Sequence, residues 1–466
     1  MVNEDSERDR HPSSFRDPDG YIFHQGDSIL RYICSGYLET YSKCTVSGFF
    51  QSLFDRGLLI PHEEVEKGDD YVIIKPEKIN FCSYPYEWCF SQWKDAALLT
   101  LSLQKTALEF GFTLKDASAF NVQFHKGRPI FIDTLSFEPY VEGQVWDAYR
   151  QFCEHFLAPL ALMALKDIRL GSLFRVWIQG IPLDLAASLL PIQSRLNLNL
   201  FAHLDLHAKS QKRLADHPRD APARNTTMLS RKSLLGILDS LEMAVQSLHW
   251  KPTGTEWGDY YDNTNYSDAA LVAKQELVGQ FLDQITPTPG MVWDCGGNTG
   301  HFSRVASDRG IFTLSLDIDP AAVEQNYRQM RKKNETNLYP LVQDLTNPSN
   351  NCGWDLNERT SLIGRRSADV ALALALVHHL AIGNNVPLKQ ISEFFTRIST
   401  WLIIEFVPKE DSQVQRLLAH RKDIFPDYHE QGFENAFSKH WQQVNKVLIP
   451  GTKRILYLLV NTNVSI

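Results

Sequence analysis

The chain has 466 residues, of which 43% are hydrophobic and 22% charged, and its formal net charge is −8. These proportions are those of a globular protein, and they exclude a wholly disordered chain, a collagen-like chain and a coiled-coil rod. The length predicts two or three domains. A dedicated duplex-binding protein carries a strong basic excess, which is missing here, so nucleic acid is a disfavoured partner that only a local basic patch keeps open.

The seven cysteines form no CxxC pair and no Cys/His spacing of the zinc-binding kind. We therefore expect no disulfide framework and no bound metal. The first 17 residues are charged and lack an apolar segment, and no run of 18 apolar residues occurs in the sequence. These features predict a cytoplasmic protein without a membrane partner.

The N-terminal half reads as a flexible tail over 1–14, followed by an α+β domain over 15–206. Periodicity and turn residues predict its elements in chain order: a hairpin around Gly26, a helix over about 36–56, a strand at 71–75, a helix over 88–111, strands at 121–124 and 129–133 around Lys126-Gly127, and mostly helix over 145–206. Residues 207–232 are polar and rich in Lys and Arg, which predicts a linker or surface loop.

The remaining domain is expected over 233–466. After a helix at 233–248, strands alternate with helices: the strands are expected at 291–294, 312–317, 339–344, 369–376 and 401–407, and two more near 443–449 and 454–460 close the chain. Strands that alternate with helices predict an α/β fold, a parallel sheet covered by helices on both faces. The strands are nearly all apolar, as expected of strands buried on both sides.

The strongest local signal is VWDCGGNTGHFS at 292–303, where a strand ends at Asp294 and Gly296, Gly297 and Gly300 lead into a helix. Glycines let a ligand approach the backbone closely, and ligands of open α/β sheets bind beyond the carboxyl ends of the strands. The spacing matches neither a phosphate loop nor a GxGxxG dinucleotide loop. A carboxylate at this strand end repels a pyrophosphate but suits a cationic ligand, so the loop favours S-adenosylmethionine as the cofactor.

Two further acids follow at successive strand ends. Asp317 comes 23 residues after Asp294, where an acid can accept hydrogen bonds from ribose hydroxyls, and Asp319 is close enough to share that role. Asp344 ends the next strand, where a polar group can meet the amine of adenine.

With VWDCGGNTGHFS, LSLDIDP, LVQDL and ADVALALALVHHL in this order, the sequence resembles class I S-adenosylmethionine-dependent methyltransferases over about 255–466, including bacterial nodulation-type methyltransferases. The resemblance implies a Rossmann-like sheet of seven strands, one of them reversed by the last hairpin. It places Asp294, Gly296, Gly297, Asn298 and Gly300 at the methionine part of the cofactor, Asp317 at the ribose, Asp344 and Leu345 at the adenine, and Ile318 in the same site. Asn298 departs from the small residue usual at its position, which predicts a narrower pocket.

Methyl transfer to a hydroxyl or amine needs alignment and a base. His378 and His379, after the fourth strand, are the first candidates, although neighbouring residues cannot both point into one pocket; the alternative is that both pack at the strand end. Glu405 is another candidate. Tyr260, Tyr261, Tyr266 and Lys274 precede the first strand and either contact the cofactor carboxylate or the acceptor, or serve as ordinary packing. We assign Tyr266 and Lys274 to the cofactor.

In the N-terminal half, Asp116, Asn121 and Asp133 surround a short predicted hairpin. Their spacing is similar to the catalytic loop and metal-binding aspartate of kinase-like phosphotransferases. The departures are the Leu114-Lys115 pair before the first Asp and the lack of a glycine-rich phosphate loop. A degenerate kinase-like domain that recognises a substrate, or an ordinary loop capped by Asp and Asn, explains the pattern equally well.

The sequence thus predicts an S-adenosylmethionine-dependent methyltransferase acting on a hydroxyl or amine of a small molecule or glycan. The alternatives are a non-catalytic cofactor-binding or scaffold protein, and a bifunctional protein with a kinase-like, ATP-binding N-terminal domain. The sequence names neither the acceptor nor the oligomeric state.

Overall fold

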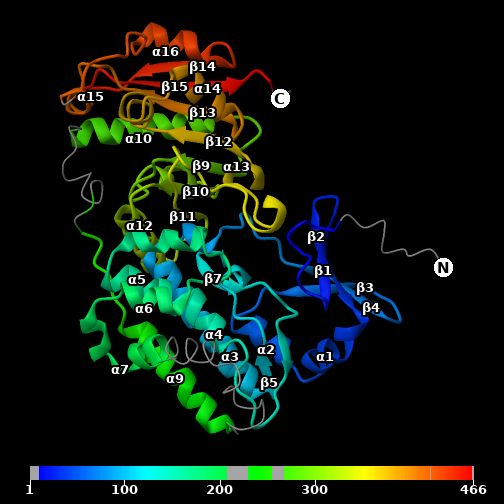
Figure 1. Ribbon diagram of the computed structural model, residues 1–466. Coiled ribbons are helices and arrows are strands. Elements are labelled where there is room, and N and C mark those ends of the chain that lie inside the picture. The colour runs from blue at the N-terminus through cyan, green and yellow to red at the C-terminus, as the bar shows by residue number, and fades with distance from the viewer. Residues whose placement is uncertain (1–9, 207–228, 254, 256–266, 420, 464–466) are drawn as a thin grey trace. The chain divides into compact units, whose positions relative to one another are not determined.

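The computed structural model describes residues 10–206, 229–253, 255, 267–419 and 421–463. The chain divides into two compact units (Figure 1). Unit 1 comprises Met1–Lys251 together with Asn351–Arg359, and unit 2 comprises Pro252–Asn350 and Thr360–Ile466. Most of the expected tail at 1–14 and most of the expected linker at 207–232 lie outside the described residues.

Unit 1 begins with a four-stranded antiparallel sheet of order β1-β2-β4-β3. Its strands are β1 (Gly20–Gln25), β2 (Ser28–Cys34), β3 (His62–Lys67) and β4 (Tyr71–Pro76). The hairpin expected around Gly26 is confirmed, since β1 and β2 pair from Gly20↔Ile33 to Gln25↔Ser28. The helix expected over 36–56 is two helices, α1 (Ser35–Val46) and α2 (Phe49–Asp55), because Gly48 adopts a left-handed conformation (φ 76°) that ends the helical path.

The rest of unit 1 surrounds the long, largely buried helix α3 (Phe90–Glu109). Two small antiparallel pairs follow it, β5 (Phe112–Leu114) with β8 (Phe137–Pro139), and β6 (Val122–His125) with β7 (Arg128–Phe131). The expected helical region is a series of short segments: α4 (Tyr149–Phe152), η4 (Cys153–Leu157), α5 (Ala158–Leu165), η5 (Ile168–Arg175), α6 (Leu183–Leu189), η6 (Ile192–Leu196), α7 (Leu198–Leu200) and η7 (Phe201–Leu206).

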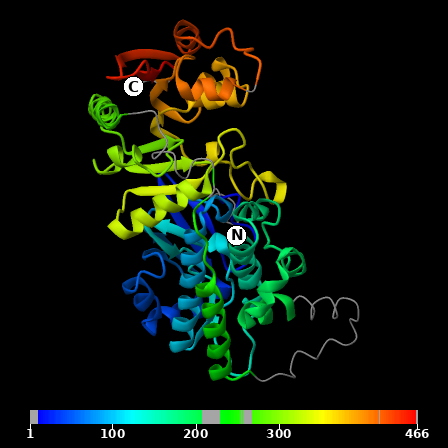
Figure 2. The same cartoon turned by 90° about the vertical axis from the view of Figure 1, so that its left-hand side faces the viewer.

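Helix α9 (Arg231–Ser247) belongs to unit 1, whereas the sequence placed residues from 233 onward in the C-terminal domain. The helix buries its apolar stripe, which includes Leu234, Leu238 and Leu241, and it contacts α3 (Figure 2). Lys94 on α3 donates to the carbonyls of Gln246 and Leu248 at the end of α9. The units therefore divide after Lys251 rather than in the polar segment before α9.

Unit 2 is built on a seven-stranded sheet of order β11-β10-β9-β12-β13-β15-β14, which can be followed strand by strand in Figure 1. The strands are β9 (Met291–Cys295), β10 (Phe312–Asp317), β11 (Leu338–Val342), β12 (Ala368–Ala373), β13 (Ser399–Phe406), β14 (Trp441–Leu448) and β15 (Ile455–Asn461). The pairs from β11 to β13 are parallel, and β15 is antiparallel to both of its neighbours. This is the class I methyltransferase topology, with the one reversed strand that the resemblance implied.

The helices of unit 2 are α10 (Asp268–Asp283), α11 (Ser303–Ser307), α12 (Pro320–Lys333), α13 (Leu362–Arg365), η11 (His379–Gly383), α14 (Leu388–Thr396), α15 (Ser412–Leu418) and α16 (Glu430–Phe437). Helix α10 contacts α11, and α14 contacts α16. The core between helices and strands includes Val278, Phe281, Val292, Leu372 and Leu458, all buried.

The strand order reverses between β9 and β12, since the chain runs outward from β9 to β11 and then returns to β12 on the other side. Such a switch point leaves a crevice at the carboxyl ends of the strands, where open α/β sheets bind ligands. Within the part of the chain that the structure describes, no helix is long and apolar enough to cross a membrane.

Candidate functional site

A cavity of about 360 Å³ lies in unit 2 at the switch point. Its wall is formed by residues that follow β9, β10, β11 and β12, together with residues of α10 and α15. The lining residues are Leu271, Lys274, Asp294, Gly296, Gly297, Asn298, Phe302, Asp317, Ile318, Gln343, Asp344, Leu345, Thr346, Leu374, Ala375, Leu376, His379, Leu380, Gly383, Asn384 and Leu417. The volume is within the range of small-molecule sites, which is about 300–1,000 Å³.

The glycine loop after β9 forms one wall of this cavity. Gly296 has φ 81°, a conformation that side chains rarely adopt. At position 297 a glycine is required for lack of space, because a Cβ would lie 2.4 Å from Ser315 Oγ. Asn298 also has a left-handed φ of 48°, and its side-chain Oδ1 accepts from the amide of Thr299 at 2.8 Å, which holds the tight turn.

Asp317, the last residue of β10, is fixed by the backbone on two sides. Its Oδ2 accepts from the amide of Asn298 and its Oδ1 from the amide of Asp319, each at 2.8 Å. Burial raises the pKa of Asp317 to about 6, and the two amide bonds offset only part of that rise. A carboxylate has about four acceptor positions, so two of them remain for a ligand in the cavity.

Asp294, at the end of β9, is a second buried carboxyl on the same cavity. Its Oδ2 accepts from the hydroxyl of Ser303 at 2.6 Å. Burial raises the pKa of Asp294 to about 6, partly opposed by Ser303 and by the positive charge of Lys274. Asp294 therefore changes charge near neutral pH.

The third acid, Asp344, is half-buried just beyond β11. Its Oδ1 accepts from both the amide and the hydroxyl of Thr346, at 2.8 and 2.6 Å. Leu345 lines the cavity beside it, and so does Ile318, which is 55% exposed although it is apolar. An exposed apolar side chain next to a polar acceptor suits a flat heterocycle with an exocyclic amine.

Lys274 on α10 contributes a positive charge to the cavity. The side chain is only 2% exposed, and its Nζ lies 2.5 Å from Oε2 of Glu405, the carboxyl group near the end of β13. Nζ also lies 4.5 Å from the centre of the Phe302 ring. Burial lowers the pKa of Lys274, and Glu405 opposes that effect.

The structure separates the two neighbouring histidines. His379 lines the cavity, whereas His378 is 1% exposed and does not. Burial lowers the pKa of His379 to about 4 and that of His378 well below its usual value, with further lowering from nearby cations. Both imidazoles are therefore neutral at neutral pH, and only His379 is placed to meet a ligand.

Comparison with known proteins identifies the chain. No family model matches it. Nodulation protein NoeA of Rhizobium meliloti (strain 1021) is 37% identical over 462 residues, which cover 95% of this chain and 94% of that protein. The chain belongs to the NoeA family.

Solved structures give only distant likenesses. The N-methyltransferase NodS from Bradyrhizobium japonicum WM9 covers 42% of this NoeA-family chain and 98% of its own, with 10% identity and a TM-score of 0.32. The bifunctional kinase-methyltransferase WbdD covers 48% of this chain and 46% of its own, with 13% identity and a TM-score of 0.31. The chain thus spans about half the length of WbdD. The fold assignment rests on the strand order of unit 2, not on these scores.

Most of the residues predicted for the cofactor in this NoeA-family chain share the one cavity. Of those predicted, Asp294, Gly296, Gly297, Asn298, Asp317, Ile318, Asp344, Leu345 and Lys274 line it, and Gly300 lies in the same loop without lining it. Tyr260, Tyr261 and Tyr266 lie outside the described residues. Of the candidate bases, His379 is on the cavity, while His378 and Glu405 are not.

The sequence analysis missed one side of the cavity. Leu376, Leu380, Gly383 and Asn384 follow or flank the two histidines, so their position next to that motif could have suggested them. Leu417 on α15 reaches the cavity from a helix that carries no motif, and only the fold places it there.

The predicted cluster in unit 1 also forms. Asp116 accepts from the amide of Ser118 and from the side chain of Gln151, and it lies close enough to Asp133 for their charges to interact. Burial raises the pKa of Asp116. Asp133 is paired with Arg31 of β2 and accepts from Ser136. Burial works to raise the pKa of Asp133, but Arg31 and Ser136 outweigh it and lower the pKa. Within the described residues, no group of three or more His, Cys, Asp or Glu side chains is arranged to hold a metal ion.

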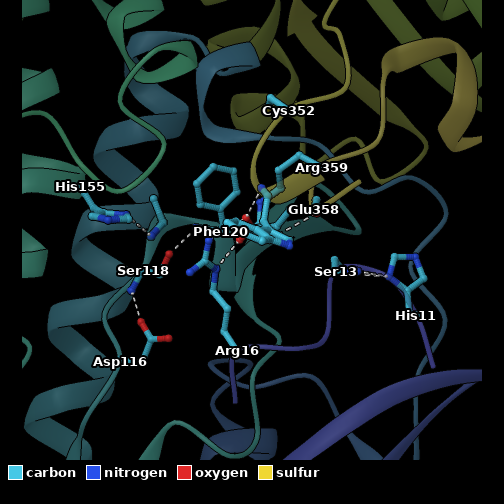
Figure 3. A network of polar contacts seen from close by, with 12 residues as sticks. His11, Ser13, Arg16, Asp116, Ser118, Phe120, His155, Cys352, Glu358 and Arg359 are labelled. Carbon is cyan, nitrogen blue, oxygen red and sulfur yellow. Dashed lines mark hydrogen bonds and ion pairs between the residues drawn. The ribbon is translucent and has the colours of Figure 1, made fainter. Parts of the chain in front are cut away.

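The excursion Asn351–Arg359 belongs to unit 1, and Figure 3 shows Glu358 and Arg359 beside Arg16 and Phe120. Arg16 donates from Nε and Nη2 to the two oxygens of Glu358, at 2.7 and 2.9 Å. The guanidinium of Arg359 lies 4.2 Å from the centre of the Phe120 ring. Cys352 and Arg359 pair as an antiparallel bridge that closes the excursion.

Proposed function

We propose that this protein is an S-adenosylmethionine-dependent methyltransferase whose cofactor site is the cavity of unit 2. The observation that carries the proposal is the meeting of three carboxyl groups from three successive strand ends, Asp294, Asp317 and Asp344, around one glycine loop in a methyltransferase fold. A dinucleotide or nucleoside triphosphate would bring phosphates against these acids, which Coulomb repulsion disfavours.

The charges of the cavity fit this cofactor. S-adenosylmethionine carries a sulfonium, an α-ammonium and one carboxylate, and the cavity offers three acids and the ammonium of Lys274. We assign Asp294 and the loop from Gly296 to Asn298 to the methionine part, Asp317 to the ribose, and Asp344 with Leu345 and Ile318 to the adenine. Lys274 is assigned to the carboxylate.

When bound, the cofactor supplies a methyl group that is already activated for transfer. The work left to the protein is alignment of the acceptor, exclusion of water and, for a hydroxyl or a protonated amine, acceptance of a proton. We assign proton acceptance to Nδ1 or Nε2 of His379, because among the candidate bases this imidazole lines the cavity. Leu376, Leu380 and Leu417 give the acceptor side an apolar wall.

The test is calorimetric titration with S-adenosylmethionine and S-adenosylhomocysteine. Asp317→Ala removes acceptors for the ribose, and hydrogen bonds to a charged group contribute about 1.5–3 kcal/mol each, so we expect binding to weaken by about 100-fold or more. Asp369→Ala is the matched control, since Asp369 also accepts two backbone amides, those of Gly290 and Met291, but at the opposite end of the sheet. Wild-type protein that is folded and binds neither compound would overturn the proposal.

A second candidate function concerns unit 1. The close approach of Asp116, Asn121 and Asp133 favours a nucleotide-binding site of the kinase-like type, while the pairing of Asp133 with Arg31 disfavours metal binding there. Titration with ATP in the presence of Mg²⁺ tests whether unit 1 binds a nucleotide. Binding that is lost in Asp133→Asn would support a bifunctional protein, and absence of binding by the folded protein would contradict a nucleotide site in unit 1.

A further inference from the structure

Four buried charges of unit 2 form a continuous row of alternating sign. Lys274 Nζ lies 2.5 Å from Glu405 Oε2, Glu405 Oε1 lies 3.3 Å from Arg454 Nη1, and Arg454 Nε lies 2.8 Å from Asp411 Oδ2. None of the four side chains is more than 10% exposed. The row joins α10, β13, the residue before β15 and the N-cap of α15, so it fixes two of the helices that contribute to the cavity wall.

Glu405 lies at the centre of this row, and both of its oxygens are engaged. Oε2 meets Lys274 and also accepts from the amide of Ala375 at 2.8 Å, while Oε1 meets Arg454. Ala375 lines the cavity with a left-handed φ of 50°, which an alanine adopts only when its surroundings hold it there. A fully buried carboxylate held in this way has no access to an acceptor, so the structure does not support the expected role of Glu405 as a base.

We propose that Glu405 is a positioning residue, which holds Lys274 in the charged form and directs its ammonium toward the carboxylate of the cofactor. The inference rests on the proposed function. Glu405 does not itself line the cavity, whereas Lys274 does, so the carboxylate of Glu405 acts on the ligand through the lysine.

The electrostatic surroundings of Lys274 explain why such a residue is needed. Burial disfavours the ammonium, and the positive charge of Arg454 disfavours it further, while Glu405 and Asp294 favour it. His378 and His301 also interact with the lysine, but both imidazoles have lowered pKa values and are neutral at neutral pH. Glu405 is therefore the principal counter-charge, and its loss lowers the pKa of Lys274 further.

The experiment compares two ligands that differ at the amino-acid end. S-adenosylhomocysteine carries a carboxylate and an ammonium there, and 5′-methylthioadenosine keeps the adenosine and thioether without either group. We expect wild-type protein to prefer S-adenosylhomocysteine, and Glu405→Gln to lose that preference at a lower pH than the wild type. The ammonium of S-adenosylhomocysteine titrates equally with wild type and with the variant, so a shift of the pH profile between the two proteins reports on residue 274. Affinity for 5′-methylthioadenosine is expected to stay within about threefold.

Three further variants complete the test. Lys274→Met should reduce the preference at every pH to the part that the ligand's ammonium contributes, and Lys274→Arg combined with Glu405→Gln should restore it at high pH, because arginine stays charged without a counter-ion. Glu324→Gln is the matched control. Glu324 is fully buried and pairs with Arg328 on α12, but it does not line the cavity, so this change should leave the pH profile as in wild type.

The outcomes separate the inference from the proposed function. If wild type binds none of the adenosine ligands, the proposed function fails. If wild type prefers S-adenosylhomocysteine and Glu405→Gln keeps the wild-type pH profile, the role of Glu405 is overturned. Should Glu405→Gln not fold, Lys274→Met/Glu405→Gln removes both charges together, a change that buried pairs tolerate better than the loss of one partner. A preference of wild-type size in that double variant would equally overturn the inference.

Discussion

Asp294 and Asp317 are carboxyl groups whose surroundings disfavour the ionised form. Both are buried, and burial raises the pKa of each to about 6, roughly two units above the ordinary value of an aspartic acid. Each unit of pKa corresponds to about 1.4 kcal/mol, so at neutral pH the fold tolerates a cost on the order of a few kcal/mol to keep these groups ionised. A cationic ligand at this position offsets that cost.

This charge predicts a pH-dependent choice between two ligands. S-adenosylmethionine has a sulfonium where S-adenosylhomocysteine has a neutral thioether, and only the ionised form of Asp294 attracts the sulfonium. Because the folded-state pKa is about 6, Asp294 is protonated below that value and ionised above it. We expect the affinity ratio of the methyl donor to its demethylated product to rise about tenfold between pH 5 and 7.5, as measured by calorimetry.

The control for that prediction is Asp294→Asn, which keeps the size of the side chain and removes the titration. In this variant the affinity ratio should be flat over the same range of pH. A ratio that rises equally in wild type and in Asp294→Asn would assign the dependence to another group, of which Asp317 is the nearest candidate.

Individual cavity residues could be predicted from the sequence where an acidic residue stands at the end of an apolar strand. Asp294, Asp317 and Asp344 each follow an apolar strand, and parallel strands bring such ends together, so their meeting in one cavity was predictable. The contacts of Glu405 were not predictable, because its partners Lys274 and Arg454 are 131 and 49 positions away in the sequence. These residues are brought together only by the folded sheet.

At the scale of elements, the loop between β9 and α11 is the most constrained part of unit 2. The Ser315 hydroxyl, which a Cβ at Gly297 would approach to 2.4 Å, is itself fixed by Ser303 at 2.9 Å and by Asn326 at 3.0 Å. The neighbours of Gly297 are held by their own hydrogen bonds, so an added methyl group has no side to which it can be accommodated cheaply.

We therefore expect Gly297→Ala to destabilise unit 2 by about 1–3 kcal/mol, the usual cost of overpacking, and to weaken S-adenosylhomocysteine binding. The measurements are the thermal unfolding of the full chain and calorimetry. Gly290→Ala, at the other end of β9, is the control, because its Cβ would meet only Asp369 Oδ2 at an ordinary 3.4 Å. Equal behaviour of the two variants would contradict the steric explanation.

Element boundaries were predicted closely where buried strands alternate with amphipathic helices. Strand β10 was expected at 312–317 and lies there, since its apolar run is bounded by Gly310 and by the N-cap Asp319. The helix of 36–56 was predicted as one element because its apolar spacing continues past Gly48, and only the left-handed backbone of that glycine interrupts it. Periodicity alone does not report such a break.

At the scale of the whole molecule, the division of the chain differs from a simple succession of domains. Residues Asn351–Arg359 lie between β11 and β12 in the sequence but belong to unit 1. Glu358 is 1% exposed, and its pKa is lowered chiefly by the hydrogen bonds from Arg16. The sequence analysis did not detect this excursion, because nothing in a short polar segment indicates which unit it packs against.

Arg16→Ala should loosen the excursion without disturbing the cavity of unit 2. Removing the arginine leaves a buried carboxylate without its main partner, and since Arg16 is half-exposed we expect a local cost of about 1–2 kcal/mol. Hydrogen exchange should accelerate at the amides of Cys352 and Arg359, which bond to each other's carbonyls at 3.1 and 3.0 Å.

The matched control is Arg169→Ala, which also removes an arginine that bonds a carboxylate through two nitrogens. Its partner Asp167 is only two residues away, and Arg169 is 83% exposed, so exchange in the excursion should not change. Unaltered exchange in Arg16→Ala would show that the bridge between Cys352 and Arg359 holds the excursion by itself.

The same excursion sets an order of events during synthesis. Unit 1 needs residue 359 to be complete, which is 108 residues beyond Lys251 (359 − 251), and by then the ribosome has already made the first three strands of the sheet in unit 2. At about 5–20 residues per second, the N-terminal half waits roughly 5–20 s for its last piece. A nascent chain of this protein thus holds two incomplete units at the same time. Unit 1 is completed only after part of unit 2 has been synthesised.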